Sequence, residues 1–368
     1  MKIKSFEFNL RELAGSMGDF GTLFPFAIGY IVVCGLDPAG LLVMMGLANI
    51  VTGLIYKLPM PIEPMKVLGV AAIAQHWSPE LVYASAFAMG VVWLIFAWTG
   101  IIDWIARITP LSVIRGVQVT LGVMLALEAF KMISGGWLLG AISIIIVLVL
   151  RQNRYAPAAV VLMVLGLAIL IWKGQLQVAL PHVKLPPLTH FSLEQVWVVM
   201  MAAGFAQIPL TATNAVIATS ALIKKYWPDR EVKEKNLSLN MGIMNLVLPF
   251  FGGMPLCHGA GGLAGQYYFG ARTGGTNIIE GVIEIALGIF LSASIAHLFY
   301  LFPTAIIGAM MLMVGIELTK FARDLRPDKN LIPMGVTVTA ALVSNMFFGF
   351  LAGLLCHYIL KPTTHRYP

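Results

Sequence analysis

The chain has 368 residues, of which 59% are hydrophobic and only 11% charged, with a mean hydropathy of +0.86. Soluble domains carry about 25% charged residues, so the composition excludes a soluble enzyme or nucleic-acid-binding domain and predicts an all-α polytopic membrane protein. The formal net charge of +7 then reports membrane topology, and the three scattered cysteines lack the spacing of a metal site, so that no cofactor is expected.

Apolar segments recur from Leu13 to His357, and a helix needs about 20 apolar residues to cross a bilayer. In the first half the pattern predicts helices near 12–34, 39–57, 79–106, 110–133, 136–151 and 156–172, with a broken segment near 58–76. In the second half it predicts helices near 194–223, 237–252, 276–301, 303–320, 330–346 and 348–361, with a broken segment near 253–270. We therefore expect one membrane domain of fourteen segments, in which segments 3 and 10 are broken.

The two halves show an internal duplication. With an offset of 196 residues, MGLANIV at 45–51 aligns with MGIMNLV at 241–247, and Pro59 aligns with Pro255. With an offset of 193, Pro110 aligns with Pro303 and Gly122 with Gly315. The repeats are expected to cover 12–173 and 193–361. Because each holds an odd number of segments, they must be inverted relative to one another in the membrane.

The distribution of positive charge gives the orientation, because Lys and Arg gather in cytoplasmic loops. With the N-terminus inside, 20 of the 24 Lys and Arg residues fall on the inner face. Only Lys131, Lys173 and Lys184 fall outside, and Lys66 lies within a broken segment. The sequence therefore predicts an integral protein of a bacterial inner membrane, with both termini cytoplasmic.

The two broken segments predict a site for an anion. Prolines at 59, 61 and 64 forbid a continuous first helix, and Pro64 suits the first turn of a half-helix. In the stretch GGMPLCHGAGGLAGQYYFGAR at 252–272, a half-helix is expected to begin near His258. Opposed helix N-termini offer free N–H groups and partial positive charge, and the sequence Gly259, Ala260, Gly261, Gly262 would let an oxyanion approach the backbone. The alternative is that these glycines only allow tight helix packing.

Three charged residues lie at membrane depth, where charge is costly. Glu63 and Lys66 are three residues apart and can pair on one helix face. Lys66 could contact a dianion or serve only as a structural partner of Glu63. Asp19 could likewise contribute to the site or only cap a turn between Gly18 and Gly21. Either Asp19 or Glu63 could carry a coupling proton.

Helix 8 carries a polar stripe. Gln207, Thr211 and Asn214 follow spacings of four and three, so they are expected to project from one face and line the cavity, or else to form hydrogen bonds between helices. His258 could bind the substrate or be a packed, hydrogen-bonded histidine. Gln266 is expected to face the site.

At these residues the sequence resembles the molybdate transporter family, which is related to the sulfate permeases. The motifs that carry the resemblance are GDFGTLFPF at 18–26, PMPIEPMK at 59–66 and GGMPLCHGAGGLAGQYYFGAR at 252–272. The resemblance implies a uracil-permease type of fold. A core domain would comprise segments 1–4 and 8–11, about 12–107 and 194–301, and a gate domain would comprise segments 5–7 and 12–14, about 110–173 and 303–361.

The same resemblance implies that the substrate lies between the half-helices of segments 3 and 10, flanked by helices 1 and 8. Roles carry over to Asp19, Glu63, Lys66, His258 and the glycines that follow it. The gate helices of similar proteins commonly form dimers, so a homodimer is an expectation.

The function expected from these features is secondary active transport of a tetrahedral oxyanion, with molybdate first and tungstate or sulfate as alternatives. A nucleobase or aromatic carboxylate permease on the same fold is the runner-up, but it would need carboxylates where Gln207, Thr211 and glycines stand. A membrane-embedded enzyme is the alternative of another class. The sequence contains no HExxH, GxSxG or Walker motif to support it.

Overall fold

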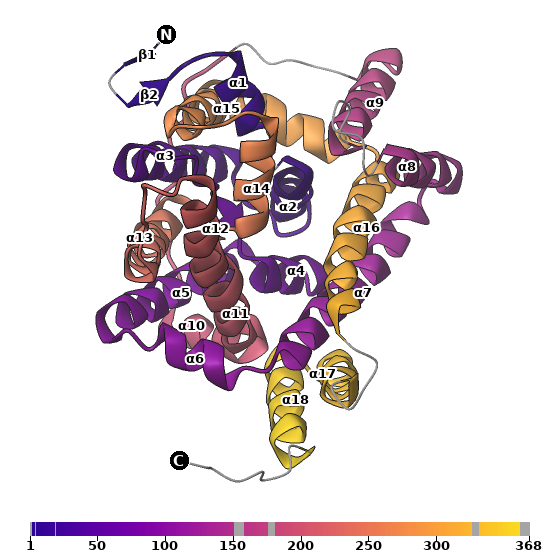
Figure 1. Cartoon of the computed structure of the whole chain (residues 1–368). Coiled ribbons are helices and arrows are strands. Elements are labelled where there is room, and N and C mark those ends of the chain that lie inside the picture. Colours follow the sequence, from indigo (N-terminus) through magenta and orange to yellow (C-terminus); the bar gives the residue numbers. More distant parts are fainter. Residues whose placement is uncertain are drawn as a thin grey trace.

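The structure is a computed structural model that describes residues 2–3, 5–18, 20–150, 158–175, 181–325 and 331–360. These residues are almost entirely helical (Figure 1), and the few extended residues form two short antiparallel pairs. The N-terminal pair is β1 (Lys2–Ile3) with β2 (Phe6–Glu7). The second pair joins distant parts of the chain and lies at the centre of the molecule.

The first half of the chain contains nine helices and one of the central strands within the described residues. Their bounds are α1 (Leu10–Ser16), α2 (Phe20–Val32), α3 (Pro38–Tyr56), β3 (Glu63–Pro64), α4 (Lys66–Ala74), α5 (Pro79–Thr99), α6 (Ile102–Ile108), α7 (Leu111–Ile133), α8 (Trp137–Leu150) and α9 (Ala158–Trp172).

The second half repeats this order and adds short π-helical and 3₁₀ turns. The bounds are α10 (Leu193–Val199), π-helical η1 (Met200–Gly204), α11 (Phe205–Thr211), π-helical η2 (Ala212–Ala218), α12 (Thr219–Tyr226), α13 (Glu234–Val247), 3₁₀ η3 (Leu248–Phe251), β4 (Leu256–Cys257), α14 (Ala260–Phe269), α15 (Gly275–Leu301), α16 (Thr304–Lys320), 3₁₀ η4 (Phe321–Asp324), α17 (Leu331–Val343) and α18 (Met346–Leu360).

Local sequence explains where several helices begin and end. Asp37 caps α3 by accepting hydrogen bonds from the N–H groups of Ala39 and Gly40, and Pro38 occupies the first turn. Lys57 ends α3 in the left-handed conformation. Gly100 ends α5 in the same way, with φ +69°. The predicted helix 79–106 is therefore wrong as one element, since the chain breaks at Gly100 and α6 follows.

The predicted helix 12–34 is also divided. The N–H groups of Met17 and Gly18 bond to Ala14 and Gly15, three residues back, and this tightening ends α1. A new helix, α2, begins at Phe20. Pro25 lies inside α2 and Pro209 inside α11.

Within the part of the chain that the structure describes, six helical stretches are long and apolar enough to cross a membrane. They are 38–56, 79–99, 111–133, 193–226, 275–301 and 304–324, and five shorter apolar helices accompany them. The long stretch 193–226 is continuous from α10 to α12 through both π-helical turns.

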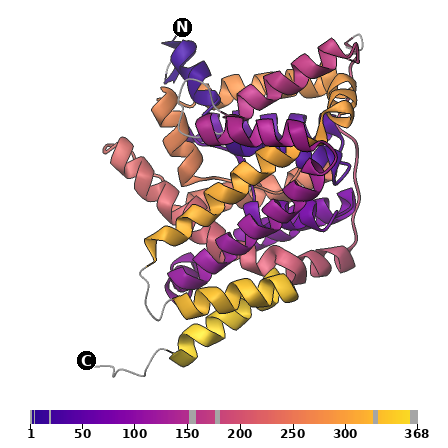
Figure 2. The ribbon, with the colours of Figure 1, turned by 90° about the vertical axis from the view of Figure 1, so that its right-hand side faces the viewer.

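The helices form two groups (Figures 1 and 2). In one group α3 packs along α15 and α5 packs along α13, around the central α2, α4, α11 and α14. In the other group the long helices α7 and α16 cross, and α8, α9, α17 and α18 pack beside them. Glycines make the close crossings: an added Cβ on Gly122 would lie 2.6 Å from the Gly315 carbonyl oxygen, and one on Gly46 would lie 2.5 Å from that of Gly281.

Candidate functional site

The two broken segments meet through their extended residues. β3 pairs antiparallel with β4, with Glu63 opposite Cys257 and Pro64 opposite Leu256. The Met65 N–H extends the pairing by donating to the Pro255 carbonyl at 3.0 Å. Each strand leads directly into a short helix, α4 or α14. The sequence thus brings together the starts of two half-helices that are almost two hundred residues apart in the chain.

Two buried asparagines hold these extended residues in place. The Asn245 side chain donates to the Leu256 carbonyl at 2.6 Å and accepts from the Leu256 N–H at 2.8 Å. The Asn277 side chain makes the same two bonds to Met60, at 2.6 and 2.9 Å. Met60 and Leu256 are equivalent in the duplication, yet their asparagines come from different helices, α15 and α13. We call each of these two-bond contacts an asparagine clamp. Both clamps satisfy backbone groups that an extended chain would otherwise leave unpaired in the interior.

These two clamps were not predicted from the sequence. The alignment of Asn49 with Asn245 was a signal for the clamp that Asn245 forms on Leu256, but Asn49 itself plays a different part. Its amide donates to Glu284 at 2.9 Å, and its carbonyl oxygen accepts from Asn277 at 3.0 Å. Asn49 therefore links the Met60 clamp to Glu284 on α15.

The N-terminus of α4 is already capped. The Gln207 side-chain oxygen accepts from the N–H groups of Val67 and Leu68, at 2.7 and 3.2 Å, and its amide donates to Thr211. The expectation of two equally bare helix starts is wrong for α4, because a side chain of α11 occupies these amides. Helix α4 also begins at Lys66, so Pro64 lies in β3 and not in the first helical turn.

The polar stripe of helix 8 is only partly reproduced. Gln207 and Thr211 are buried and in contact, as their spacing predicts. Asn214 lies in the π-helical turn η2, whose wider winding shifts it from the α-helical register. Among the described hydrogen bonds, none joins its side chain to the other two.

The N-terminus of α14 differs from that of α4. Gly259 precedes the helix in an extended conformation, and no side chain of the described residues caps it. The helix starts at Ala260, so His258 belongs to the lead-in and not to the helix. Gly261 is exposed, and a Cβ there would meet nothing within 4 Å. This is the open helix start of the pair.

Glu63 and Lys66 lie beside that start. Lys66 Nζ is 2.6 Å from Glu63 Oε2, which confirms the predicted pairing, although Glu63 reaches it from a strand and not from a helix face. The Glu63 carboxylate is buried and lies against Gly259 and Gly262. Lys66 keeps 20% of its side chain exposed. The Glu63 carboxylate therefore lies between a partly exposed ammonium and the open start of α14.

His258 is completely buried between the two segments. Its Nδ1 lies 3.3 Å from the Pro61 carbonyl, and its ring packs edge-on against Tyr56 at 6.0 Å. Because a carbonyl only accepts, Nδ1 carries the proton in this contact, and the Nε2 atom of a neutral ring is then an acceptor. No hydrogen-bond partner of Nε2 lies among the described residues.

Gln266 is also fully buried, and neither atom of its amide has a hydrogen-bond partner among the described residues. Its backbone packs on Gly18, whose added Cβ would lie 2.6 Å from the Gln266 nitrogen. Asp19, which follows Gly18 in the chain, lies outside the described residues, so its predicted role stays a prediction. Gln266 is thus adjacent to the chain position that precedes Asp19.

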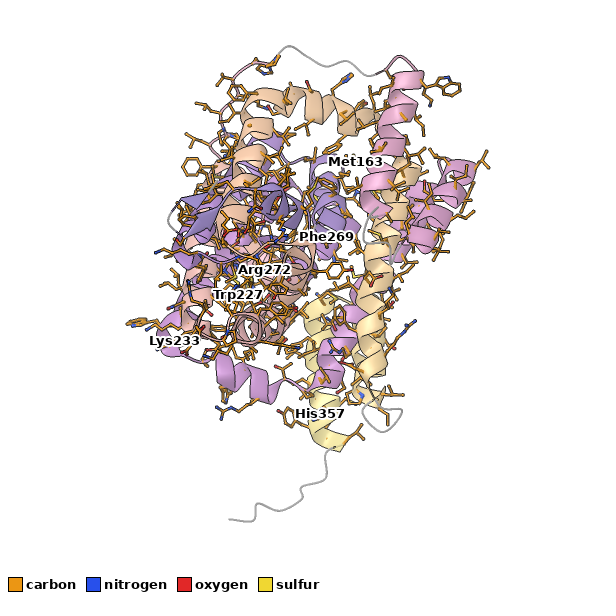
Figure 3. All side chains as sticks on the ribbon, turned by 45° about the horizontal axis from the view of Figure 1, so that its top comes forward. Met163, Trp227, Lys233, Phe269, Arg272 and His357 are labelled. Atoms are coloured by element: carbon orange, nitrogen blue, oxygen red, sulfur yellow. The ribbon has the colours of Figure 1, made fainter. Side chains whose placement is uncertain are left out.

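The other end of α14 is fixed by an aromatic cluster. Tyr267 stacks on Tyr226 at 4.0 Å between ring centroids, and the Arg272 guanidinium lies 3.7 Å from the centre of the Tyr267 ring. Trp227 meets the same ring edge-on, and Figure 3 shows Trp227 and Arg272 close together. The cluster joins α14 to the end of α12, so the two elements are expected to move together.

Comparisons with known proteins give the family of the chain. The family model described as "Molybdate transporter of MFS superfamily" matches residues 11–125 and 199–318. Molybdate transporter 1 of Arabidopsis thaliana is 31% identical over 407 residues, which cover 96% of this chain and 89% of that protein. Molybdate transporter 2 of the same plant is 28% identical, over 96% of this chain and 88% of that protein.

Solved structures show the same fold. The transmembrane domain of the cyanobacterial bicarbonate transporter BicA matches with a TM-score of 0.71 at 15% identity, over 96% of this chain and 98% of that one. Murine solute carrier 26 family member A9, an anion transporter in the inward-facing state, also gives 0.71, at 12% identity, over 98% of this chain and 69% of that one. The chain therefore belongs to the molybdate transporter family, and it is an integral membrane transporter rather than an enzyme.

Proposed function

We propose that the protein is a secondary active transporter of a tetrahedral oxyanion and that molybdate is its substrate. The observation that carries the proposal is the open N-terminus of α14, with the side chains of Lys66 and His258 beside it. Bare N–H groups, a helix dipole and one ammonium suit a small, doubly negative solute. The names of the Arabidopsis relatives support molybdate in particular.

Substrate-binding roles are proposed for the residues that surround this start. They are Lys66, His258, Gly259, Ala260, Gly261 and Gly262, with Gln266 deeper along α14 and Asp19 from the first segment. Gln207 and Thr211 act indirectly, because they hold the start of α4. Asp19 and Glu63 are the candidates for carrying a coupling proton.

The transport movement is proposed to be a displacement of a core domain against a gate domain. The packing supports two inverted repeats: α3 with α15 mirrors α13 with α5, and α7 with α17 mirrors α16 with α8. The equivalent residues Gly122 and Gly315 touch each other, as expected at a pseudo-twofold axis. In this scheme there are fourteen segments, both termini are cytoplasmic, and α7 and α16 belong to the gate.

Binding to the purified full-length protein tests the substrate. Calorimetric titrations with molybdate, tungstate and sulfate should show saturable binding, with molybdate tightest. Uptake of labelled molybdate into proteoliposomes, with excess sulfate as competitor at two pH values, then separates transport from binding. Absence of heat and of thermal stabilisation with all three oxyanions would remove the proposed substrate class.

A further inference from the structure

A carboxylate of the chain itself lies against the open start of α14. A Cβ added to Gly262 would come within 2.1 Å of Glu63 Oε1, and one added to Gly259 would come within 2.6 Å of Glu63 Oε2. Any residue other than glycine at these two positions would therefore displace the carboxylate. The glycines thus make room for an anion, and in this structure the anion beside them is Glu63.

Two positive groups lie beside the buried Glu63 carboxylate. Only 3% of the residue is exposed, and a buried charge needs a partner. Lys66 supplies one at 2.6 Å, and the partial positive charge of the α14 N-terminus supplies a second. In this structure, the positive groups proposed to attract the substrate are therefore balanced by Glu63.

An oxyanion cannot be added to this arrangement unchanged. Against Gly259 and Gly262 it would stand in the space of the Glu63 carboxylate, and its two negative charges would repel that carboxylate at close range. Either the side chain moves away or the carboxylate loses its charge. In a buried place, a carboxylate that loses Lys66 to the substrate is better accommodated as a neutral acid.

We propose that Glu63 is a resident anion that the substrate replaces, and that Glu63 takes up one proton as it gives up Lys66. This inference rests on the proposed function, because it requires the oxyanion to bind at α14. Of the two candidate proton carriers, Asp19 and Glu63, the proposal selects Glu63. One proton is taken up for each dianion that binds. The proton ends on a Glu63 carboxyl oxygen, and no covalent bond to the substrate is formed.

The other ionisable groups near Glu63 help to decide whether oxyanion binding takes up or releases a proton. Lys66 on α4 pairs with the carboxylate, Cys257 lies opposite Glu63 in β4, and His258 follows Cys257. Asp19 lies outside the described residues. An incoming dianion opposes Lys66 and strengthens the hold of Glu63 on a proton. Binding therefore takes up a proton, and by linkage the affinity for the oxyanion rises as the pH falls.

The experiment measures proton uptake and affinity on the purified full-length protein. Molybdate is titrated by calorimetry in buffers of different ionisation enthalpy, over a pH range in which the free oxyanion stays a dianion. The wild type should take up close to one proton per molybdate, and its Kd should fall up to about tenfold for each unit of lowered pH. Glu63→Gln should take up none, bind independently of pH, and bind at least as tightly as the wild type at the upper end of the range.

Glu317→Gln is the matched control, because Glu317 lies on α16 with half its side chain exposed and pairs with Lys320. It should keep the pH dependence of the wild type. The proton count is made on the wild type and so does not depend on a variant that folds. Binding without proton uptake, or a pH dependence that survives in Glu63→Gln, would overturn the resident-anion role while leaving oxyanion transport intact. Failure of molybdate, tungstate and sulfate to bind at any pH would instead remove the proposed function.

Discussion

Lys66 is the residue whose charge the proposed site depends on most directly. Lys66→Ala should weaken oxyanion binding, because a hydrogen bond to a charged group contributes about 1.5–3 kcal/mol, which is roughly a tenfold to hundredfold change in Kd. Calorimetric titration of the purified protein with molybdate measures this change in Kd. Lys320→Ala, at the partly exposed end of α16, is the control.

The Lys66→Ala substitution also affects Glu63, the ion-pair partner of Lys66. Removal of Lys66 alone also leaves the Glu63 carboxylate without its ammonium partner, which is costly in a buried place. The same substitution is therefore repeated in a Glu63→Gln background. If Lys66→Ala leaves the affinity of that background unchanged, Lys66 does not contact the oxyanion and only balances Glu63.

The asparagine clamps lead to a prediction about stability. Asn277→Leu removes both hydrogen bonds to Met60 and strands a buried N–H and a buried carbonyl, each at a cost of about 1–3 kcal/mol. The apparent Tm in detergent should fall by several degrees. Asn240→Leu is the comparison, because Asn240 contacts the side chains of Thr52, at a long 3.5 Å, and of Tyr56, and both of these residues lie on α3 outside the broken segments. An Asn277→Leu protein as stable as Asn240→Leu would show that the clamp does not hold the strand.

The sequence was most informative about backbone breaks. The prolines at 59, 61 and 64 and the glycines after Gly252 carry their conformational preferences locally, so both broken segments could be predicted. The Glu63–Lys66 pair was predicted from a spacing of three, and it forms at 2.6 Å even though Glu63 precedes the helix. Such features depend on residues that are near in the chain.

What could not be predicted depends on tertiary contacts. The cap that Gln207 places on α4 joins residues 140 positions apart, and the Asn277 clamp on Met60 spans 217. The duplication would have assigned equivalent roles to equivalent residues, yet Met60 and Leu256 are held from different helices. Similar N-termini in the sequence therefore became a capped start at α4 and an open one at α14.

At the scale of elements, the α7–α16 crossing should tolerate no side chain. A Cβ on Gly122 would lie 2.6 Å from the Gly315 carbonyl oxygen and 2.5 Å from the Thr319 methyl, so Gly122→Val must separate the helices. We expect a fall in thermal stability and in transport. Gly335→Ala on α17 is the control, since a Cβ there meets nothing within 4 Å. A Gly122→Val protein with wild-type stability would show that the crossing is not closely packed.

At the scale of the whole molecule, the two groups of helices meet around a cavity of about 220 Å³ beside the end of α4. Ala74 and Gln75 line it from α4, and Ser344 and Asn345 line it from the turn between α17 and α18. His76, just after α4, lies 3.5 Å from Glu128 on α7. If transport moves one group against the other, these contacts must separate once in every cycle.

Cross-linking tests this movement directly. Cysteines at Gln75 and Asn345, in a Cys356→Ser background, should be joined by a short bifunctional maleimide, because both residues line the same cavity and the other two cysteines are buried. Molybdate uptake should then stop, while each single-cysteine variant treated with the same reagent retains it. A cysteine pair at Ser344 and Leu127, which lie in the same group of helices, is the matched control. Its cross-link should leave transport largely intact, because it joins parts that are not proposed to separate. Full uptake with Gln75 joined to Asn345 would show that the half-helix end and the α17–α18 turn keep their positions during transport, and a core displaced against a gate would then be excluded.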